Sequence, residues 1–152
     1  MISIAKESDC EALTSLTFSS KAYWGFTAEQ IKAWKQDLTI TSNYLTTHTT
    51  YKLESRANVI EGYYSYIKQE DFLLVDNLFI APESIGKGLG RILMNHFFEQ
   101  MTAEKIDKTK LYSEIKAEEF YLKMGFETHG YFWSSLSDRK LPLMVKELSN
   151  YN

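Results

Sequence analysis

Three glycines at alternate positions constrain the fold of this chain more than any other feature: Gly86, Gly88 and Gly90. They follow an apolar run of β type that ends at Ala81-Pro82, and an apolar pattern of helical period comes after them. Because glycine lacks a Cβ atom, the backbone of such a loop can adopt positive φ angles, and a ligand can approach it closely. A helix that begins here presents unpaired N–H groups and the positive end of its dipole. The segment therefore predicts a strand, a loop and a helix whose first turn can hold a diphosphate.

The first part of the sequence predicts one strand and two helices. Ile2 and Ile4 alternate with polar residues, which is typical of a short strand. Ser8 or Asp9 can cap a helix that continues to about Ser20.

An aromatic-rich connection at residues 21–26 leads to the second helix. We expect Thr27 to cap this helix, because Gln30 three residues later completes a capping box. The apolar stripe of the helix consists of Ile31, Trp34 and Leu38.

The pattern changes to that of β-strands from about Tyr44 to Ile80. β-Branched and aromatic residues predict three strands, and residues 68–71 form a tight turn between the last two. The three strands are Thr47–Leu53, Ala57–Ile67 and Leu73–Ile80.

Helices and strands alternate in the last part of the chain. The long helix after the glycines has a buried stripe made of Leu89, Ile92, Leu93, Phe97 and Met101. Gly125 is expected to end the next helix, because glycine readily adopts the left-handed conformation found there. The elements in order are a helix at about Gly88–Glu104, a strand at Leu111–Ser113, a helix at Lys116–Met124, and a hairpin of Thr128–Leu136 and Leu141–Leu148 around residues 137–140.

This order of elements predicts a single mixed α/β domain over residues 1–152. The net charge of −3 and the absence of a basic run disfavour nucleic-acid binding. Cys10 is the only cysteine, which excludes an intrachain disulfide and fits a reducing cytoplasm. No apolar stretch approaches the ~18 residues of a membrane span, so we expect no membrane partner.

The sequence does not match either of two common nucleotide-binding motifs. A P-loop requires Gly at position 81 and Ser or Thr at position 88, where the chain has Ala81 and Gly88. A dinucleotide fingerprint that begins at Gly86 requires Gly at position 91, where the chain has Arg91. Taken alone, the glycines leave an ordinary turn before a helix as the alternative.

A second motif downstream narrows the interpretation. It is Ala117-Glu-Glu-Phe-Tyr-Leu-Lys-Met-Gly-Phe126, and the first is Ile85-Gly-Lys-Gly-Leu-Gly90 after Pro82. Together they resemble two motifs of the GCN5-related N-acetyltransferase (GNAT) superfamily: the acetyl-CoA loop, Gln/Arg-x-x-Gly-x-Gly/Ala, and the Ala-x-x-Phe-Tyr-x-x-x-Gly-Phe segment. There are two departures. Ile85 stands where Gln or Arg is usual, and Ser113-Glu114 stands where many members have an Asn that helps to hold the cofactor.

The resemblance implies a mixed α/β fold with a mostly antiparallel central sheet, flanked by helices and splayed in a V between the fourth and fifth strands. It also implies an acetyl-CoA-dependent N-acetyltransferase that moves an acetyl group to a primary amine of a small molecule or peptide. Two alternatives stay open: a non-catalytic acyl-CoA sensor of the same fold, and an acyltransferase with another acyl group or an O-acceptor. A homodimer also stays open.

The resemblance assigns the cofactor site as well. Backbone N–H groups of the glycine loop would hold the diphosphate, with nearby cations on Lys87 and Arg91. The strand before the loop would hold the pantetheine arm and polarise the thioester carbonyl through a backbone N–H. The residues implied for CoA are Leu78, Phe79, Ile80, Ile85, Gly86, Lys87, Gly88, Leu89, Gly90, Arg91, Glu114 and Tyr121.

Two catalytic roles follow from the same resemblance. Tyr121 resembles the family's general acid, and its ordinary pKa of about 10 keeps its hydroxyl protonated at neutral pH; the alternative is a packing role. The family often places a basic carboxylate on the fourth strand, where Leu74 occupies the position of a Glu in some members. Asp76 shares a strand face with Leu74 and is our candidate base, with a structural hydrogen bond as its alternative. Glu114 is a second candidate base.

Acceptor recognition is expected from the segment between the first two helices, which line the acceptor side in the family. Tyr23, Trp24 and Phe26 can form an apolar or cation-binding wall there, or can pack in the core. The three histidines are far apart and there is one cysteine, so we expect no metal site.

Overall fold

The computed structural model describes residues 1–134 and 139–148, and its internal contacts divide the chain into two compact units. Unit 1 comprises residues 1–66 and 77–93, and unit 2 comprises residues 67–76 and the described residues from 94 onward. Residues 137 and 138 of the predicted final turn lie outside the described residues. That the chain forms a single domain stays a prediction.

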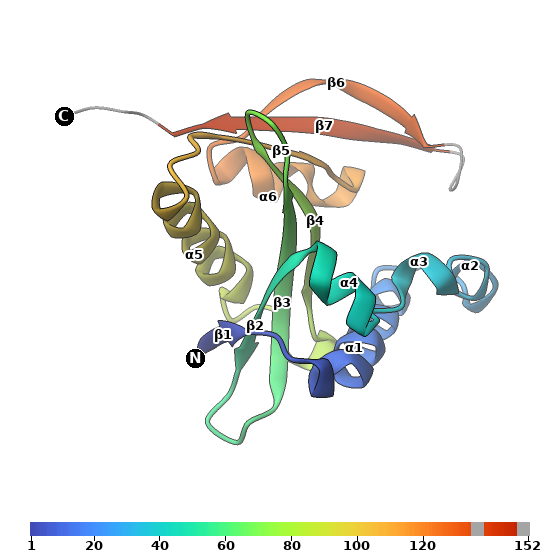
Figure 1. Ribbon diagram of the computed structural model, residues 1–152. Helices are drawn as coiled ribbons and strands as arrows, with labels where there is room; N and C mark the ends of the chain where they lie inside the picture. Colours follow the sequence, from blue (N-terminus) through green and yellow to red (C-terminus); the bar gives the residue numbers. More distant parts are fainter. Residues whose placement is uncertain (135–138, 149–152) are drawn as a thin grey trace. The chain divides into compact units, whose positions relative to one another are not determined.

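In the part of the chain that the structure describes, seven strands form one mixed sheet in the order β1-β2-β3-β4-β5-β7-β6. The pairs β1–β2, β2–β3, β5–β7 and β6–β7 are antiparallel, whereas β4 and β5 are parallel. The strands, labelled in Figure 1, are β1 (Ile2–Ile4), β2 (Thr49–Glu54), β3 (Ile60–Lys68), β4 (Leu73–Ile80), β5 (Lys108–Tyr112), β6 (Glu127–Ser134) and β7 (Arg139–Glu147).

Along the chain, helices lie between the paired strands β1 and β2, and another helix follows the loop after β4 (Figure 1). No helix within the described parts of the chain is both long enough and apolar enough to cross a bilayer. The helices are α1 (Cys10–Tyr23), α2 (Ala28–Ala33), α3 (Lys35–Leu38), α4 (Ser42–Thr47), α5 (Leu89–Ala103) and α6 (Glu118–Lys123), with short 3₁₀ turns η1 (Glu7–Asp9), η2 (Pro82–Ser84) and η3 (Ile115–Ala117).

The parallel pairing of β4 with β5 is short. Within the described residues the register joins only Leu73 to Thr109 and Leu74 to Lys110, although β4 continues to Ile80. The Thr109 hydroxyl donates a hydrogen bond of 2.8 Å to the Leu73 carbonyl, which fixes this register. The predicted splay between the fourth and fifth strands is therefore confirmed, and so is the mixed, mostly antiparallel sheet.

The first half of the chain departs from the prediction in three places. The first helix continues to Tyr23 and so includes half of the predicted connection. The predicted second helix is interrupted at Trp34, which is buried, and becomes α2 and α3. The β-type pattern that we expected from about Tyr44 begins instead with α4, which includes the first predicted strand residue, Thr47, because the Thr41 hydroxyl accepts the Tyr44 N–H at 3.0 Å and caps a helix. The predicted capping box of Thr27 and Gln30 is confirmed.

The second half follows the prediction more closely. The bounds of β4 match, and α5 differs by one residue at each end. Ile92 was wrongly placed in the buried stripe of α5, because it is 47% exposed and the fully buried Met94 takes its place. β5 begins three residues earlier than predicted, since the polar Thr109 is buried on the same face as Leu111.

A buried ion pair ties the first turn of the chain to β2 within unit 1. The Asp9 carboxylate accepts the Lys6 N–H at 2.8 Å and lies 2.8 Å from the Lys52 ammonium, so it does not cap α1 as predicted. Lys52 is 7% exposed and also lies 3.3 Å from Glu54. Burial alone would raise the pKa of Asp9, but hydrogen bonds from Lys52 and Lys6 outweigh burial and lower it.

Replacing Asp9 with Asn should destabilise the protein by about 1–3 kcal/mol at pH 7, because the buried Lys52 ammonium loses its closest partner. Because the pKa of Asp9 is lower in the folded state, this difference should be present above about pH 4 and should disappear as the pH falls through the pKa of folded Asp9. Urea unfolding at pH 7 and at a pH below the pKa of folded Asp9 measures this difference in the free energy of unfolding. Glu7→Gln, an exposed carboxylate in the same turn, is the matched control and should change stability by less than about 0.5 kcal/mol. Equal effects of the two changes would contradict the assignment.

Candidate functional site

The loop after β4 has an open backbone. The turn η2 follows Ala81, whose carbonyl accepts the Ser84 N–H at 2.9 Å. Gly86 has a φ of 91° and Gly88 a φ of 76°, and a Cβ atom added at either position would meet nothing within 4 Å. Both glycines are therefore required by their left-handed backbone and not by crowding. The space beside them is free for a ligand.

The first turn of α5 begins beside this space, and its leading N–H groups have no partner within the helix. The Ile92 N–H donates to the Gly88 carbonyl at 3.2 Å, which makes Gly88 the residue that precedes the helix. The N–H groups of residues 89–91 consequently have no carbonyl partner one turn earlier in the helix. Lys87 and Arg91 are exposed beside them. This arrangement of amides, dipole and cations can hold a diphosphate.

Glu61 on β3 anchors the loop, and the sequence analysis missed this residue. Its backbone carbonyl accepts the Ala81 N–H at 2.9 Å, and its carboxylate accepts the hydroxyl of the buried Ser84 at 2.8 Å. The same carboxylate lies 3.5 Å from the Lys87 ammonium. Three successive parts of the loop are thus tied to one residue of the neighbouring strand.

The end of β4 carries the residues predicted for the pantetheine arm. Leu78, Phe79 and Ile80 are partly exposed, as is Ile85 in the loop. The Phe79 ring lies 5.9 Å from the Tyr63 ring and 5.5 Å from the Lys21 ammonium.

The residues predicted for the acceptor wall divide into two kinds. Tyr23 and Trp24 are 54% and 47% exposed, with their rings 5.2 Å apart at 86°. Phe26 instead packs against the buried Trp34 at 5.3 Å and lies under the Lys21 ammonium at 4.8 Å. The packing alternative therefore describes Phe26, and the acceptor role of all three residues stays a prediction.

A polar network that the sequence analysis also missed crosses unit 1. Its members come from α1, α4, β3 and β4, and its hydrogen bonds join side chains far apart in the sequence. They are Thr17 to Tyr63 at 2.5 Å, Asn77 to Tyr63 at 3.3 Å, Asn77 to Tyr44 at 3.0 Å and Tyr44 to Ser65 at 2.6 Å. The His48 ring stacks on Tyr44, with ring centroids 3.9 Å apart.

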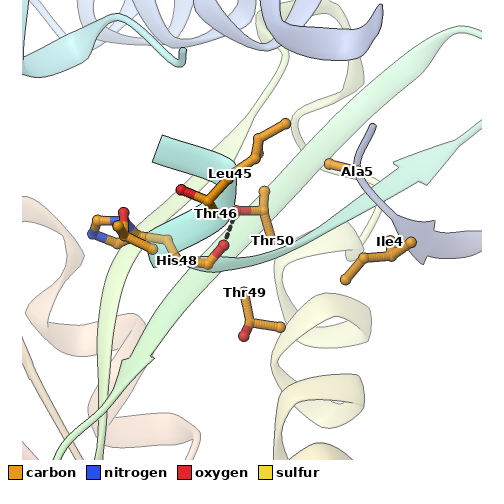
Figure 2. Close-up of a pocket in the computed structure, with 8 residues that line it drawn as sticks. Ile4, Ala5, Leu45, Thr46, His48, Thr49 and Thr50 are labelled. Carbon is orange, nitrogen blue, oxygen red and sulfur yellow. Dashed lines mark hydrogen bonds between the residues drawn. The ribbon is translucent and has the colours of Figure 1, made fainter. Parts of the chain in front are cut away.

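A cavity of about 180 Å³ lies at the junction of α4 and β2 (Figure 2). Threonines, His48, Leu45, Ile4 and Ala5 line it, and the Thr50 hydroxyl donates to the His48 carbonyl at 3.2 Å. None of the glycine-loop residues is among the residues that line it. The cavity is therefore separate from the predicted cofactor loop.

Tyr121 belongs to unit 2 and is 7% exposed on α6. Its ring packs between Phe120 at 5.1 Å and Phe126 at 5.5 Å. Burial raises the pKa of its hydroxyl above the ordinary value. In the described part of the chain no hydrogen bond to this hydroxyl is found, whereas every buried side-chain nitrogen or oxygen has a partner.

The two candidate bases differ in their surroundings. Glu114 accepts a hydrogen bond from the Arg139 guanidinium at 2.6 Å, and both side chains are about one-third exposed. Asp76 is exposed on β4. Glu114 is therefore held in an ion pair.

The sequence profile of the acetyltransferase (GNAT) domain matches residues 17–132. The chain belongs to the GNAT acetyltransferase family. A search of curated protein sequences finds no match.

Solved structures show the same fold at low sequence identity. An N-acetyltransferase, PaiA from Thermoplasma acidophilum with coenzyme A, is 18% identical, with a TM-score of 0.78 over 97% of this chain and 99% of that one. The ribosomal-protein-S18-alanine N-acetyltransferase from Escherichia coli is 18% identical, with a TM-score of 0.74 over 100% and 96%. An aminoglycoside 6′-N-acetyltransferase with coenzyme A is 12% identical, with a TM-score of 0.75 over 100% and 99%.

The second family motif ends in a helix stop that holds Tyr121. The Gly125 N–H donates to the Leu122 carbonyl at 3.1 Å, and the Phe126 N–H donates to the Tyr121 carbonyl at 3.0 Å. With Gly125 at a φ of 95° and the rings of Tyr121 and Phe126 in contact, this is a Schellman motif with its hydrophobic contact. The glycine therefore fixes where the Tyr121 ring packs.

Gly125→Ala should lower the free energy of unfolding by about 1–2 kcal/mol, because alanine is strained in the left-handed region. A Cβ atom would also meet the flexible end of Lys146. Chemical denaturation measures the loss. Gly125→Asn is the control, since asparagine tolerates the left-handed region, and it should cost less than the alanine change. An alanine variant as stable as the wild type would show that this turn does not depend on glycine.

Proposed function

We propose that this GNAT family member is an acetyl-CoA-dependent N-acetyltransferase that acts on a primary amine of a small molecule or peptide. The observation that carries the proposal is the open loop at Gly86 and Gly88, which leads into the unpaired N–H groups of α5. The CoA complexes among similar structures support binding of CoA or an acyl-CoA. The choice of the acetyl group and of an amine acceptor is our proposal.

Residues of the loop and of the end of β4 bind different parts of CoA in this proposal. Amides of residues 86–90 bind the diphosphate, and Lys87 and Arg91 add positive charge. Residues 78–80 lie along the pantetheine arm, and a backbone N–H of this segment polarises the thioester carbonyl. Acetyl-CoA supplies the activated acetyl group. Ile85 contributes no polar group, so the loop relies on its backbone.

Tyr121 donates a hydrogen bond to the leaving sulfur in this proposal. Because its pKa is raised by burial, the hydroxyl is protonated at neutral pH. Full proton transfer from this phenol to a thiolate, whose ordinary pKa is about 8.5, is uphill. Its contribution is therefore to stabilise negative charge on the sulfur as the bond breaks.

Asp76 is the base in this proposal. A protonated amine has no lone pair for attack, so a carboxylate must remove a proton first. Asp76 lies on β4, the strand on which the family often places its basic carboxylate, and it is exposed. We therefore place Asp76 before Glu114 in this role.

A thiol-release assay tests the function. Acetyl-CoA is supplied with spermidine, kanamycin, L-alaninamide or a peptide with a free amino terminus, and with no amine to measure hydrolysis. Amine-dependent thiol release with an acetylated product in mass spectra would support the proposal. CoA binding without amine-dependent thiol release would favour the sensor alternative. The presence of Ile85 where the family usually has Gln or Arg supports that alternative.

Gly88→Asp should weaken CoA binding by roughly 3–5 kcal/mol, because it adds a negative charge where the diphosphate is to bind. Gly88→Asn is the matched control: it has the same size, carries no charge and tolerates a positive φ. Isothermal calorimetry with CoA compares the two variants. Equal affinities of both variants would mean that the diphosphate binds elsewhere.

Tyr121→Phe should reduce kcat by about 10–100-fold, the worth of a hydrogen bond to a charged group. The affinity for acetyl-CoA should stay within about twofold, since the ring that packs against Phe126 remains. Steady-state kinetics with the best amine of the panel measure both. Tyr112→Phe, an exposed tyrosine of the same unit, is the control. An unchanged kcat in Tyr121→Phe would assign the tyrosine to packing.

A further inference from the structure

Asn77 on β4 has an amide that is held in one orientation, and the reason lies in a chain of hydrogen bonds. The Thr17 hydroxyl donates to the Leu13 carbonyl at 2.8 Å. Its only hydrogen is then used, so the 2.5 Å bond to Tyr63 must have the tyrosine as donor. The hydrogen of Tyr63 is used in turn. The oxygen of Tyr63 can therefore only accept from residue 77, which places the Asn77 nitrogen, and not its carbonyl, toward Tyr63 at 3.3 Å.

The second hydrogen of the same nitrogen is also engaged. It donates to the Tyr44 hydroxyl at 3.0 Å, and that hydroxyl lies 2.6 Å from the hydroxyl of Ser65. Both N–H bonds of the Asn77 amide thus point at tyrosines. Turning the amide over would place its oxygen opposite the oxygen of Tyr63, which has no hydrogen left to offer.

The carbonyl oxygen of Asn77 is left as an acceptor. No hydrogen bond to this oxygen is found in residues 1–134 and 139–148, where every buried side-chain nitrogen or oxygen does have a partner. Asn77 is partly exposed, so its carbonyl oxygen is in contact with solvent. An oxygen fixed in this way accepts hydrogen bonds and cannot donate them.

The position of Asn77 connects it with the proposed chemistry. It immediately precedes residues 78–80, which hold the thioester in the proposed function. Side chains alternate along a strand, so Asn77 shares a face with Phe79, about 7 Å further on, and lies opposite Asp76 and Ile80. A Cβ atom added at Gly62 would contact both Ile80 and Leu93 of α5. Asn77 therefore projects from the face of β4 that is turned away from α5.

We propose that the Asn77 carbonyl oxygen accepts a hydrogen bond from the acceptor amine and orients it for attack on the thioester. The inference rests on the proposed function and names the residue that selects the acceptor. Because Asp76 lies on the opposite face of β4, it takes the proton of this amine through a water molecule. A primary amine keeps N–H bonds after it has lost a proton, so one of them can remain on the Asn77 oxygen while the lone pair turns to the carbonyl carbon. Thr17, Tyr63 and Tyr44 are positioning residues, because they act only by fixing the amide.

The test compares acceptor kinetics with cofactor binding. The probe is the panel amine with the highest wild-type kcat/KM. Asn77→Ala should lower its kcat/KM by about 10–100-fold, mainly through a higher KM for the amine. The Kd for CoA and the amine-independent hydrolysis of acetyl-CoA should stay within about twofold. Asn43→Ala, an exposed asparagine on α4, is the matched control and should leave every parameter unchanged.

A second variant tests the orientation of the amide. Thr17→Val removes the acceptor of the Tyr63 hydrogen, so that Tyr63 can donate to residue 77 and the amide can turn over. The KM for the amine should rise by less than in Asn77→Ala, and the double variant should resemble Asn77→Ala alone, because both changes act on one oxygen. If Asn77→Ala does not fold, Asn77→Ser removes the amide carbonyl oxygen while keeping a polar group, and the same loss in kcat/KM for the amine is expected.

Two outcomes would overturn the inference. If the wild type is active and Asn77→Ala leaves the KM for the amine unchanged, this inference is overturned while the proposed function stands. The same holds if Asn77→Ala reduces CoA binding and acetyl-CoA hydrolysis as much as it reduces kcat/KM for the amine, because such a general loss indicates a structural role. A wild type that binds CoA but acetylates no amine overturns the proposed function and this inference together.

Discussion

The attachment of the glycine loop to β3 at Glu61 is the constraint on which the proposed cofactor loop depends. A loop with two glycines at positive φ is free to adopt many conformations, and its amides bind a diphosphate only when they are held in one of them. Glu61 reduces that freedom by accepting from Ala81 through its backbone and from Ser84 through its carboxylate. Because the Ser84 side is buried, this bond is shielded from competition with water.

The same carboxylate has a second effect on the loop. It lies 3.5 Å from the Lys87 ammonium, whose side chain is 59% exposed. The Lys87 end of this pair is exposed while the Glu61 side chain is 17% exposed. Solvent at the ammonium weakens such a pair, so under the proposed function Lys87 can exchange the carboxylate for a phosphate at low cost. The buried contact with Ser84 thus fixes the loop, while the exposed contact leaves a cation available for the ligand.

The elements around this loop could be predicted because their signals are local. β4 is an apolar run bounded by a turn and by Pro82, and α5 follows glycines with a helical period. α4 could not be predicted, because threonines and aromatic residues favour strands and only the Thr41 cap decides for a helix. Glu61 and Asn77 were missed for a related reason. A polar residue in a strand shows its role only through partners such as Thr17 or Ser84, which the sequence does not bring together.

The Tyr121 motif shows why a sequence match assigns a fold more firmly than a reaction. Gly125 and Phe126 end α6 in a Schellman motif, and the Tyr121 ring and carbonyl take part in that stop. These contacts need an aromatic ring at position 121 but not a hydroxyl. A chain could therefore keep the whole motif for packing after its chemistry had been lost. The hydroxyl is the part of the motif that packing does not explain, so the case for catalysis by Tyr121 depends on that single atom.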